Sequence, residues 1–208
     1  LDVLAGLARR LKHLPPTLVG FANRRANELP GKPLQNAAAL LRDGEIETVF
    51  AKSLLPTYDV FDEQRYFEAG QAVQTFELNG RTIAVTICED IWNDGELSRW
   101  SSYTERPLDA LDSESIDLIV NLSASPYTIS KHAIRKQIVC DLVKKLQTPI
   151  LYANQVGGND DLLFDGRSFY VDANGNYERE AKLFAEDLLI IDTKESNQSP
   201  IQHLEESE

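Results

Sequence analysis

The sequence predicts a soluble domain of the layered α/β class, and three observations lead to this expectation. Apolar runs at 83–88, 116–122 and 150–156 are short enough to be strands buried on both faces. Between the second and third runs, residues 134–146 place an apolar side chain at every fourth position, as on one face of a helix that Ser130 can cap. Strands and helices that alternate in this way are typical of α/β layers.

The first third of the chain predicts one helix and the start of a series of hairpins. Apolar residues recur at steps of three and four over 1–11, which indicates an amphipathic helix that Pro15-Pro16 ends. Residues 17–21 follow as a strand. Three dipeptides that favour the left-handed conformations of a tight hairpin lie between apolar segments: Asp43-Gly44, Asn79-Gly80 and Asn174-Gly175.

The end of the chain predicts a last strand at 188–191, followed by a polar tail. We therefore expect one domain over residues 1–193, with 194–208 as a tail or linker.

Composition narrows the possible partners. The chain has 208 residues, of which 42% are hydrophobic, and 33 acidic against 21 basic residues leave a formal charge of -12. This charge argues against nucleic acid and anionic membranes as partners. No apolar stretch approaches the ~18–20 residues that a membrane span needs, and the order of a signal peptide is missing, so we expect a cytoplasmic protein. The three histidines have no metal-ligand spacing, so no metal site is expected.

One thiol has the placement of a nucleophile. Cys88 ends a predicted strand and is followed at once by Glu89-Asp90, where the chain turns. A thiol reacts as the thiolate, which needs a base, a cation or backbone amides nearby. The best candidate cation is Lys52, at the end of another predicted strand. On residue type alone, a buried structural cysteine and a solvated lysine remain open alternatives.

Four segments, in this order, resemble the nitrilase, or carbon–nitrogen hydrolase, superfamily and, within it, the glutaminase domains of glutamine-dependent NAD synthetases. The resemblance covers roughly residues 1–193. The segments are KSLLPTY (52–58) with FDE (61–63) and YFEAG (66–70), CEDIW (88–92), NLSASPY (121–127), and YANQVGGNDD (152–161) running into FDGRSF (164–169).

The resemblance implies an α-β-β-α sandwich, a homo-oligomer, and a Glu-Lys-Cys triad that hydrolyses the side-chain amide of L-glutamine. Cys88 matches the nucleophile. Lys52 matches the lysine, whose ammonium stabilises the tetrahedral oxyanion together with the backbone N–H of Glu89. The ammonia released would serve the ATP-dependent conversion of nicotinic acid adenine dinucleotide to NAD in a separate synthetase domain.

The resemblance also implies a substrate pocket. Tyr58, Glu89, Ser125 and Lys131 match positions that hold the amino and carboxylate groups of glutamine, and Glu63 corresponds to a second glutamate that orients the lysine. From the residues alone, Lys131 as an exposed helix-start lysine and Ser125 as a turn residue remain open.

Other motifs point to no further chemistry. The glycine pair in 157–160 lacks the serines of a pyrophosphate-binding loop, so we expect no cofactor in this domain, with ATP and Mg belonging to the synthetase domain. The acidic residues at 59–63 indicate a solvated face rather than a metal site. His132 is expected at the surface of a helix start, and Cys140 is expected to be structural.

The main departure of this sequence from the family pattern concerns the catalytic glutamate. It lies near the end of an early strand, whereas this sequence opens with the helix that follows that strand. No glutamate precedes Glu28, which lies in a loop-like polar stretch and is not assigned the role. The sequence as printed would therefore lack its first strands and its base, and would be inactive.

Two explanations compete. Either the segment before Leu1 supplies these parts, which the absence of methionine favours, or the chain is a remnant without turnover. Two other functions stay open: a free-standing amidase acting on another small amide, and a non-catalytic module that keeps the pocket for binding.

Overall fold

The structure is a computed structural model that describes residues 2–25, 30–92, 103, 105–111 and 115–193. It divides into two compact units, the first made of 1–76 and 84–112 and the second of 77–83 and 113–208. The elements of the first unit are α1 (Asp2–Arg10), β1 (Thr17–Arg24), β2 (Leu34–Arg42), β3 (Glu45–Ala51), α2 (Glu63–Tyr66) and the 3₁₀ turns η1 (Cys88–Ile91) and η3 (Pro107–Ala110). Strands β4 (Gln74–Leu78) and β5 (Arg81–Ile87) have residues in both units. The elements of the second unit are β6 (Leu118–Ser123), α3 (Lys131–Leu146), β7 (Ile150–Asn154), β8 (Val156–Asn159), β9 (Leu162–Asp165), β10 (Phe169–Val171) and β11 (Tyr177–Glu180).

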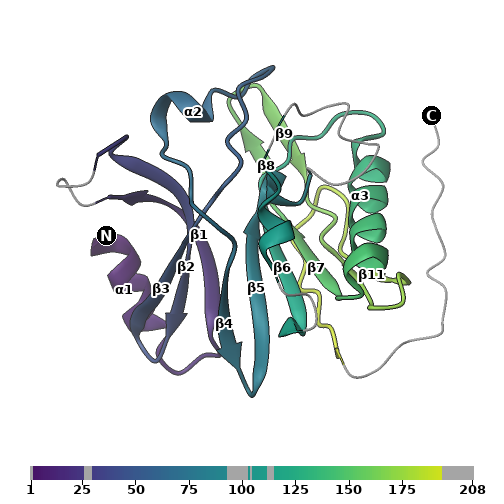
Figure 1. The fold of residues 1–208 in the computed structure, drawn as a ribbon, viewed down its shortest axis with the longest axis horizontal. Coiled ribbons are helices and arrows are strands. Elements are labelled where there is room, and N and C mark those ends of the chain that lie inside the picture. Colours follow the sequence, from purple (N-terminus) through teal and green to yellow (C-terminus); the bar gives the residue numbers. More distant parts are fainter. Residues whose placement is uncertain (1, 26–29, 93–102, 104, 112–114, 194–208) are drawn as a thin grey trace. The chain divides into compact units, whose positions relative to one another are not determined.

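In the first unit, the helix α1 covers an antiparallel sheet of order β1-β2-β3 (Figure 1). Leu4 and Ala8, one helical turn apart, pack against Ala39 and Leu41 of the central strand. The helix predicted from the three- and four-residue spacing is thus confirmed, because that spacing places the apolar side chains on the face that meets the sheet. The predicted strand at 17–21 is also confirmed, and β1 extends it to Arg24.

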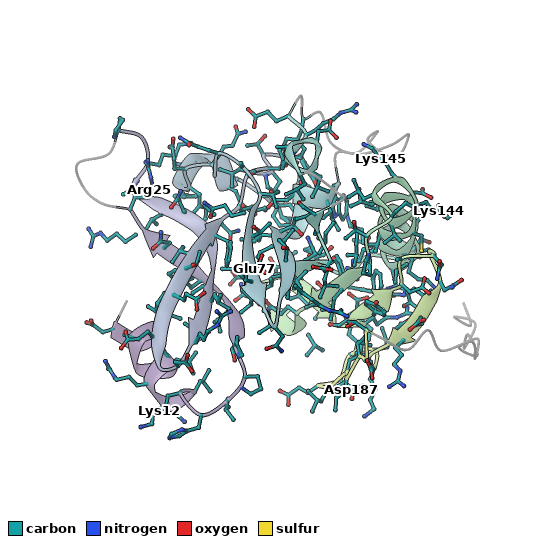
Figure 2. All side chains as sticks on the ribbon, turned by 60° about the horizontal axis from the view of Figure 1, so that its bottom comes forward. Lys12, Arg25, Glu77, Lys144, Lys145 and Asp187 are labelled. Atoms are coloured by element: carbon teal, nitrogen blue, oxygen red, sulfur yellow. The ribbon has the colours of Figure 1, made fainter. Side chains whose placement is uncertain are left out.

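In the second unit, α3 connects two parallel strands of a sheet with the order β11-β10-β7-β6-β5-β4. Strand β6 pairs in parallel with β7, and β10 pairs antiparallel with both β7 and β11. The cross-strand pair Tyr152 and Phe169 stacks with ring centroids 4.9 Å apart. Lys144 and Lys145 lie in the last turn of α3 (Figure 2), where positive charge interacts favourably with the helix dipole. The predicted α/β class is confirmed.

The three predicted hairpins are present, but they do not share one turn geometry. Asp43-Gly44 and Asn79-Gly80 both have positive φ at each residue, as expected. In the third hairpin, Gly175 has a positive φ and Asn174 does not, because the turn is built around a side chain. The carboxylate of Asp172 accepts hydrogen bonds from the backbone N–H groups of Asn174 and Asn176, at 3.0 and 2.8 Å.

Several predicted details are wrong. Residues 188–191 form no strand in the described structure, because Leu188 is 82% exposed and Ile190 is 70% exposed, so neither packs on a sheet. The run at 150–156 is two strands, since Gln155 separates β7 from β8. Ser130 precedes α3 in a left-handed conformation, and its side chain makes no capping hydrogen bond.

His132 was expected at the surface and is instead buried. Its Nε2 lies 3.4 Å from Glu180 Oε2, and its ring packs edge-on against Phe169. The first turn of α3 therefore directs one polar side chain, that of His132, toward the sheet.

The predicted tail at 194–208 and Glu28 lie outside the described residues. None of the helices in the described ranges combines the length and the apolar composition of a membrane-spanning segment.

Candidate active site

The candidate nucleophile lies in a strained turn of the first unit. Strand β5 ends at Ile87, so Cys88 is the first residue of the following 3₁₀ turn rather than the last of the strand. Its φ is 48°, a left-handed conformation that costs a non-glycine residue ~1–3 kcal/mol. Such strain persists only where neighbouring structure holds the turn in place, and here a buried carboxylate provides that restraint.

Asp90 ties the turn of Cys88 to the segment that follows Lys52. Its Oδ1 accepts hydrogen bonds from the backbone N–H groups of Ser53 and Leu54, at 3.0 and 2.8 Å, and its Oδ2 accepts one from Ile87 at 3.0 Å. Burial raises the pKa of Asp90 to about 6, although these three bonds act in the opposite direction. One side chain thus connects the segment that follows β3 to the last residue of β5.

Lys52 is buried with its charge paired. The side chain is 1% exposed, and its Nζ lies 2.7 Å from Glu63 Oε1. Asn36 contacts both partners. Its Nδ2 donates a hydrogen bond to Glu63 Oε2 at 3.1 Å, and its backbone carbonyl accepts one from the backbone N–H of Lys52 at 2.8 Å. Burial alone would lower the pKa of Lys52, but the acidic groups around it, Cys88 and Glu63 foremost, outweigh burial and raise that pKa. The ammonium is therefore a fixed positive charge.

The thiol of Cys88 is protonated at rest. Burial raises its pKa, and the Lys52 charge, which lowers it, does not compensate. Turnover through this thiol therefore needs a proton acceptor when the substrate is present. The structure thus has a partly buried thiol that interacts electrostatically with a fixed cation, the two elements that the sequence suggested.

Glu89, adjacent to the thiol, is held by two phenols. It is 4% exposed; Tyr58 donates a hydrogen bond to its Oε1, and Tyr103 donates one to its Oε2 at 2.7 Å. Edge-to-face packing against Phe61 supports the Tyr58 ring. Tyr58, Glu89, Lys52, Glu63 and Cys88, named from the sequence, therefore all lie in the first unit.

A glycine permits the backbone approach beside Lys52. The Gly70 N–H donates to the Lys52 carbonyl at 2.7 Å, and a Cβ at position 70 would lie 2.4 Å from the Ala51 carbonyl oxygen. The same region borders a cavity of about 410 Å³. Its lining residues are Lys32, Ser53, Leu54, Leu55, Thr57, Gln64, Glu68, Ala69, Tyr103 and Glu105.

The remaining two predicted residues belong to the second unit. Ser125 is 2% exposed, and its Oγ accepts a hydrogen bond from Arg135 Nε at 3.1 Å. Arg135 is itself fully buried, and its Nη1 donates to both carboxylate oxygens of Asp165, at 2.7 and 2.9 Å. Lys131 begins α3 and is partly exposed. Ser125 is thus more than a turn residue, because it belongs to a buried polar network.

Sequence reasoning missed the supporting residues Asp90, Asn36, Tyr103 and Arg135. A signal existed for Arg135, a charged residue at helical spacing from the buried Val139 and Leu142. For the other three, nothing in the local pattern separates them from ordinary polar residues of loops and strand ends.

Comparison with known proteins identifies the family. The carbon–nitrogen hydrolase family model matches residues 2–199. The chain belongs to the carbon–nitrogen hydrolase family. Among curated members of this family, glutamine-dependent NAD(+) synthetase from Synechocystis sp. is 43% identical over 192 residues, which is 91% of this chain and 34% of that protein. The Thermotoga maritima synthetase is 42% identical over 157 residues, 76% of this chain and 26% of that protein. The matched part of the chain spans between about a quarter and a third of the length of these relatives.

Solved structures confirm the predicted nitrilase-type fold. Glutamine-dependent NAD+ synthetase from Acinetobacter baumannii has a TM-score of 0.75 at 36% identity, over 89% of this chain and 33% of that one. A carbon–nitrogen hydrolase from Helicobacter pylori has a TM-score of 0.68 at 20% identity, over 87% of this chain and 62% of that one. The second likeness concerns the fold alone.

Proposed function

We propose that this carbon–nitrogen hydrolase domain hydrolyses the side-chain amide of L-glutamine with Cys88 as the nucleophile. The observation that carries the proposal is the buried ammonium of Lys52, paired with Glu63 at 2.7 Å and electrostatically coupled to the Cys88 thiol. The synthetase relatives in which this region is 42–43% identical support glutamine as the substrate.

The reaction balances in two stages. A base takes the thiol proton, Cys88 Sγ attacks the amide carbon, and the carbonyl oxygen becomes an oxyanion. Lys52 and the Glu89 N–H stabilise that oxyanion, and one such preorganised donor is worth roughly 3–4 kcal/mol of barrier. The carbon–nitrogen bond then breaks, the proton goes to the leaving nitrogen, and ammonia departs. Water adds to the thioester, which releases glutamate and restores the thiol.

The family resemblance assigns the parts of glutamine to individual residues. Glu89, aligned by Tyr58, would hold the α-ammonium group, while Lys131 and Ser125 would bind the α-carboxylate. Glu63 would act through Lys52, by fixing the position of its ammonium.

The ammonia would pass to a synthetase domain that converts nicotinic acid adenine dinucleotide to NAD with ATP and Mg. Residues 157–160 do not fit ATP, because they enter the β8–β9 hairpin, whereas a phosphate loop would lead into a helix. ATP and Mg would therefore belong to the synthetase domain. Residues 194–208 would form the linker to that domain, and the protein would assemble as a homo-oligomer.

The proposed proton acceptor is the family's catalytic glutamate, which in the family pattern lies on a strand before the helix that opens this sequence. The coding sequence upstream of Leu1 tests this point directly, since a Pro-Glu at the end of an apolar strand would complete the triad. Its absence would favour the non-catalytic binding module.

The function is tested with the full gene product and two cysteine variants. Cys88→Ala should abolish ammonia release from glutamine while NAD synthesis from free ammonium survives; Cys140→Ala, in α3, is the matched control and should retain both. Loss of both activities in a folded Cys88→Ala protein would contradict this division of roles.

Labelling tests the glutamine site separately. A diazo-ketone analogue of glutamine should label Cys88 and not Cys140, and free glutamine should protect Cys88 from the label. Hydrolysis of other small amides in preference to glutamine would favour a free-standing amidase.

A further inference from the structure

The carboxylate beside the nucleophile is held from two sides. Tyr58 follows β3 and donates to Glu89 Oε1, whereas Tyr103 lies beyond the 3₁₀ turn of Cys88 and donates to Oε2 at 2.7 Å. Both tyrosines are half-buried, and Glu89 is 4% exposed. Tyr58 matches the family pattern, but no motif in the sequence marks Tyr103.

We propose that Tyr103 is a positioning residue: its hydroxyl fixes the Glu89 carboxylate and so makes the site selective for amides that carry an α-ammonium group. This inference rests on the proposed function, because it assigns the recognition of the glutamine amino group to Glu89.

The chemistry of a carboxylate explains why a second donor matters. Each carboxylate oxygen has two lone-pair positions. A single phenol on Oε1 leaves the carboxylate plane free to rotate about its last bond, whereas a donor on each oxygen holds that plane. One lone-pair position on each oxygen then remains for the three N–H donors of an ammonium group. Fixing this geometry before the substrate arrives reduces the entropy lost on binding.

Tyr103 is suited to donate this bond throughout the neutral pH range. Burial, followed by the hydrogen bond to Glu89, raises the pKa of the Tyr103 phenol above its usual value. The hydroxyl therefore stays protonated and acts as a donor.

The hydroxyl can be tested apart from the ring. The ring also lines the cavity with Thr57 and Gln64, and Tyr103→Phe keeps that ring while removing only the donor. Tyr66→Phe is the matched control, since Tyr66 is 55% exposed in α2 and lies outside the proposed site.

The experiment compares two probes on the full gene product. One is the diazo-ketone analogue of glutamine, and the other is the same compound without its α-amino group; the rate of Cys88 labelling is measured for each. Tyr103→Phe should slow labelling by the amino-bearing probe about tenfold, the loss expected for one hydrogen bond to a charged group. Labelling by the amino-free probe should stay within about twofold of wild type. In glutamine hydrolysis, KM should rise by about the same tenfold factor with kcat nearly unchanged.

Two results for the variant would overturn the inference. An equal loss with both probes would mean that Tyr103 supports the fold of the site and not ammonium recognition, and an unchanged rate with both would mean that its hydroxyl has no role. Failure of the proposed function looks different, because the wild-type protein itself would then show no preference for the amino-bearing probe.

Discussion

Replacing Glu63 with glutamine would leave a buried lysine without its counter-ion. Lys52 is 1% exposed, and its Nζ lies 2.7 Å from Glu63 Oε1. Breaking a buried pair by removing one partner costs about 3–5 kcal/mol, because the remaining charge stays desolvated. Glutamine conserves the size and one acceptor oxygen of Glu63. We therefore expect Glu63→Gln to lower the free energy of unfolding by about 3 kcal/mol, at the lower end of that range.

The residue just before α2 offers a matched control. Asp62, the neighbouring residue, pairs with Arg65 at 3.8 Å, and these side chains are 57% and 70% exposed. Exposed pairs contribute about 0–1 kcal/mol, so Asp62→Asn should leave stability nearly unchanged. Both variants remove one negative charge, and they differ in whether the ion pair that is broken is buried or exposed.

Urea unfolding of wild type and both variants, followed by fluorescence, measures the difference. Because Glu63 raises the pKa of Lys52, the variant should also lower that pKa, and the rate of Cys88 alkylation by iodoacetamide against pH reports the change. If Glu63→Gln and Asp62→Asn lowered the free energy of unfolding equally, and the pH dependence of Cys88 alkylation did not change, the view that Lys52 is a buried, paired charge would be refuted.

Two further predictions concern the restraints around the site. Burial raises the pKa of Asp90 to about 6 from an unfolded value of 3.8, so between these values the folded protein binds more protons. The free energy of unfolding of the wild type should therefore fall by about 3 kcal/mol, relative to that of Asp90→Asn, as pH rises through this window. Urea unfolding of both proteins measures this, and a difference between them that does not change with pH would contradict the prediction. Gly70→Ala should cost about 1–3 kcal/mol, because its Cβ would lie 2.4 Å from the Ala51 carbonyl oxygen. In the control Gly20→Ala, the added Cβ has no atom within 4 Å, so stability should not change. Equal melting temperatures for both variants would count against the close approach of Gly70 to Ala51.

Much of the architecture could be predicted from local pattern. The spacing of Leu4 and Ala8 predicts the face of α1 that meets the sheet, and Asp43-Gly44 and Asn79-Gly80 predict their turns. The placement of Cys88 directly after a strand follows from the apolar run before it. Each of these features depends on backbone conformations and periodicities within a few residues of the position concerned.

Local pattern failed where a distant partner decides the outcome. The run at 188–191 has the composition of a strand, yet a strand needs a neighbour with which to pair and a surface to cover. His132 is polar, and its burial depends on the aromatic ring and carboxylate that other strands bring to the start of α3.

The sequence by itself predicted the fold class, and it pointed to Cys88 and Lys52 as the candidate nucleophile and its lysine, since these predictions follow from short segments that resemble family motifs. Only the tertiary structure decided how the site is held: Asp90 joins two strand ends, and Tyr103 shares Glu89 with Tyr58. The physical reason is that a buried polar group must find its hydrogen-bond partners wherever the fold brings them. Ser53 lies 37 residues from Asp90, and Tyr58 and Tyr103 lie 31 and 14 residues from Glu89, beyond the reach of any local pattern.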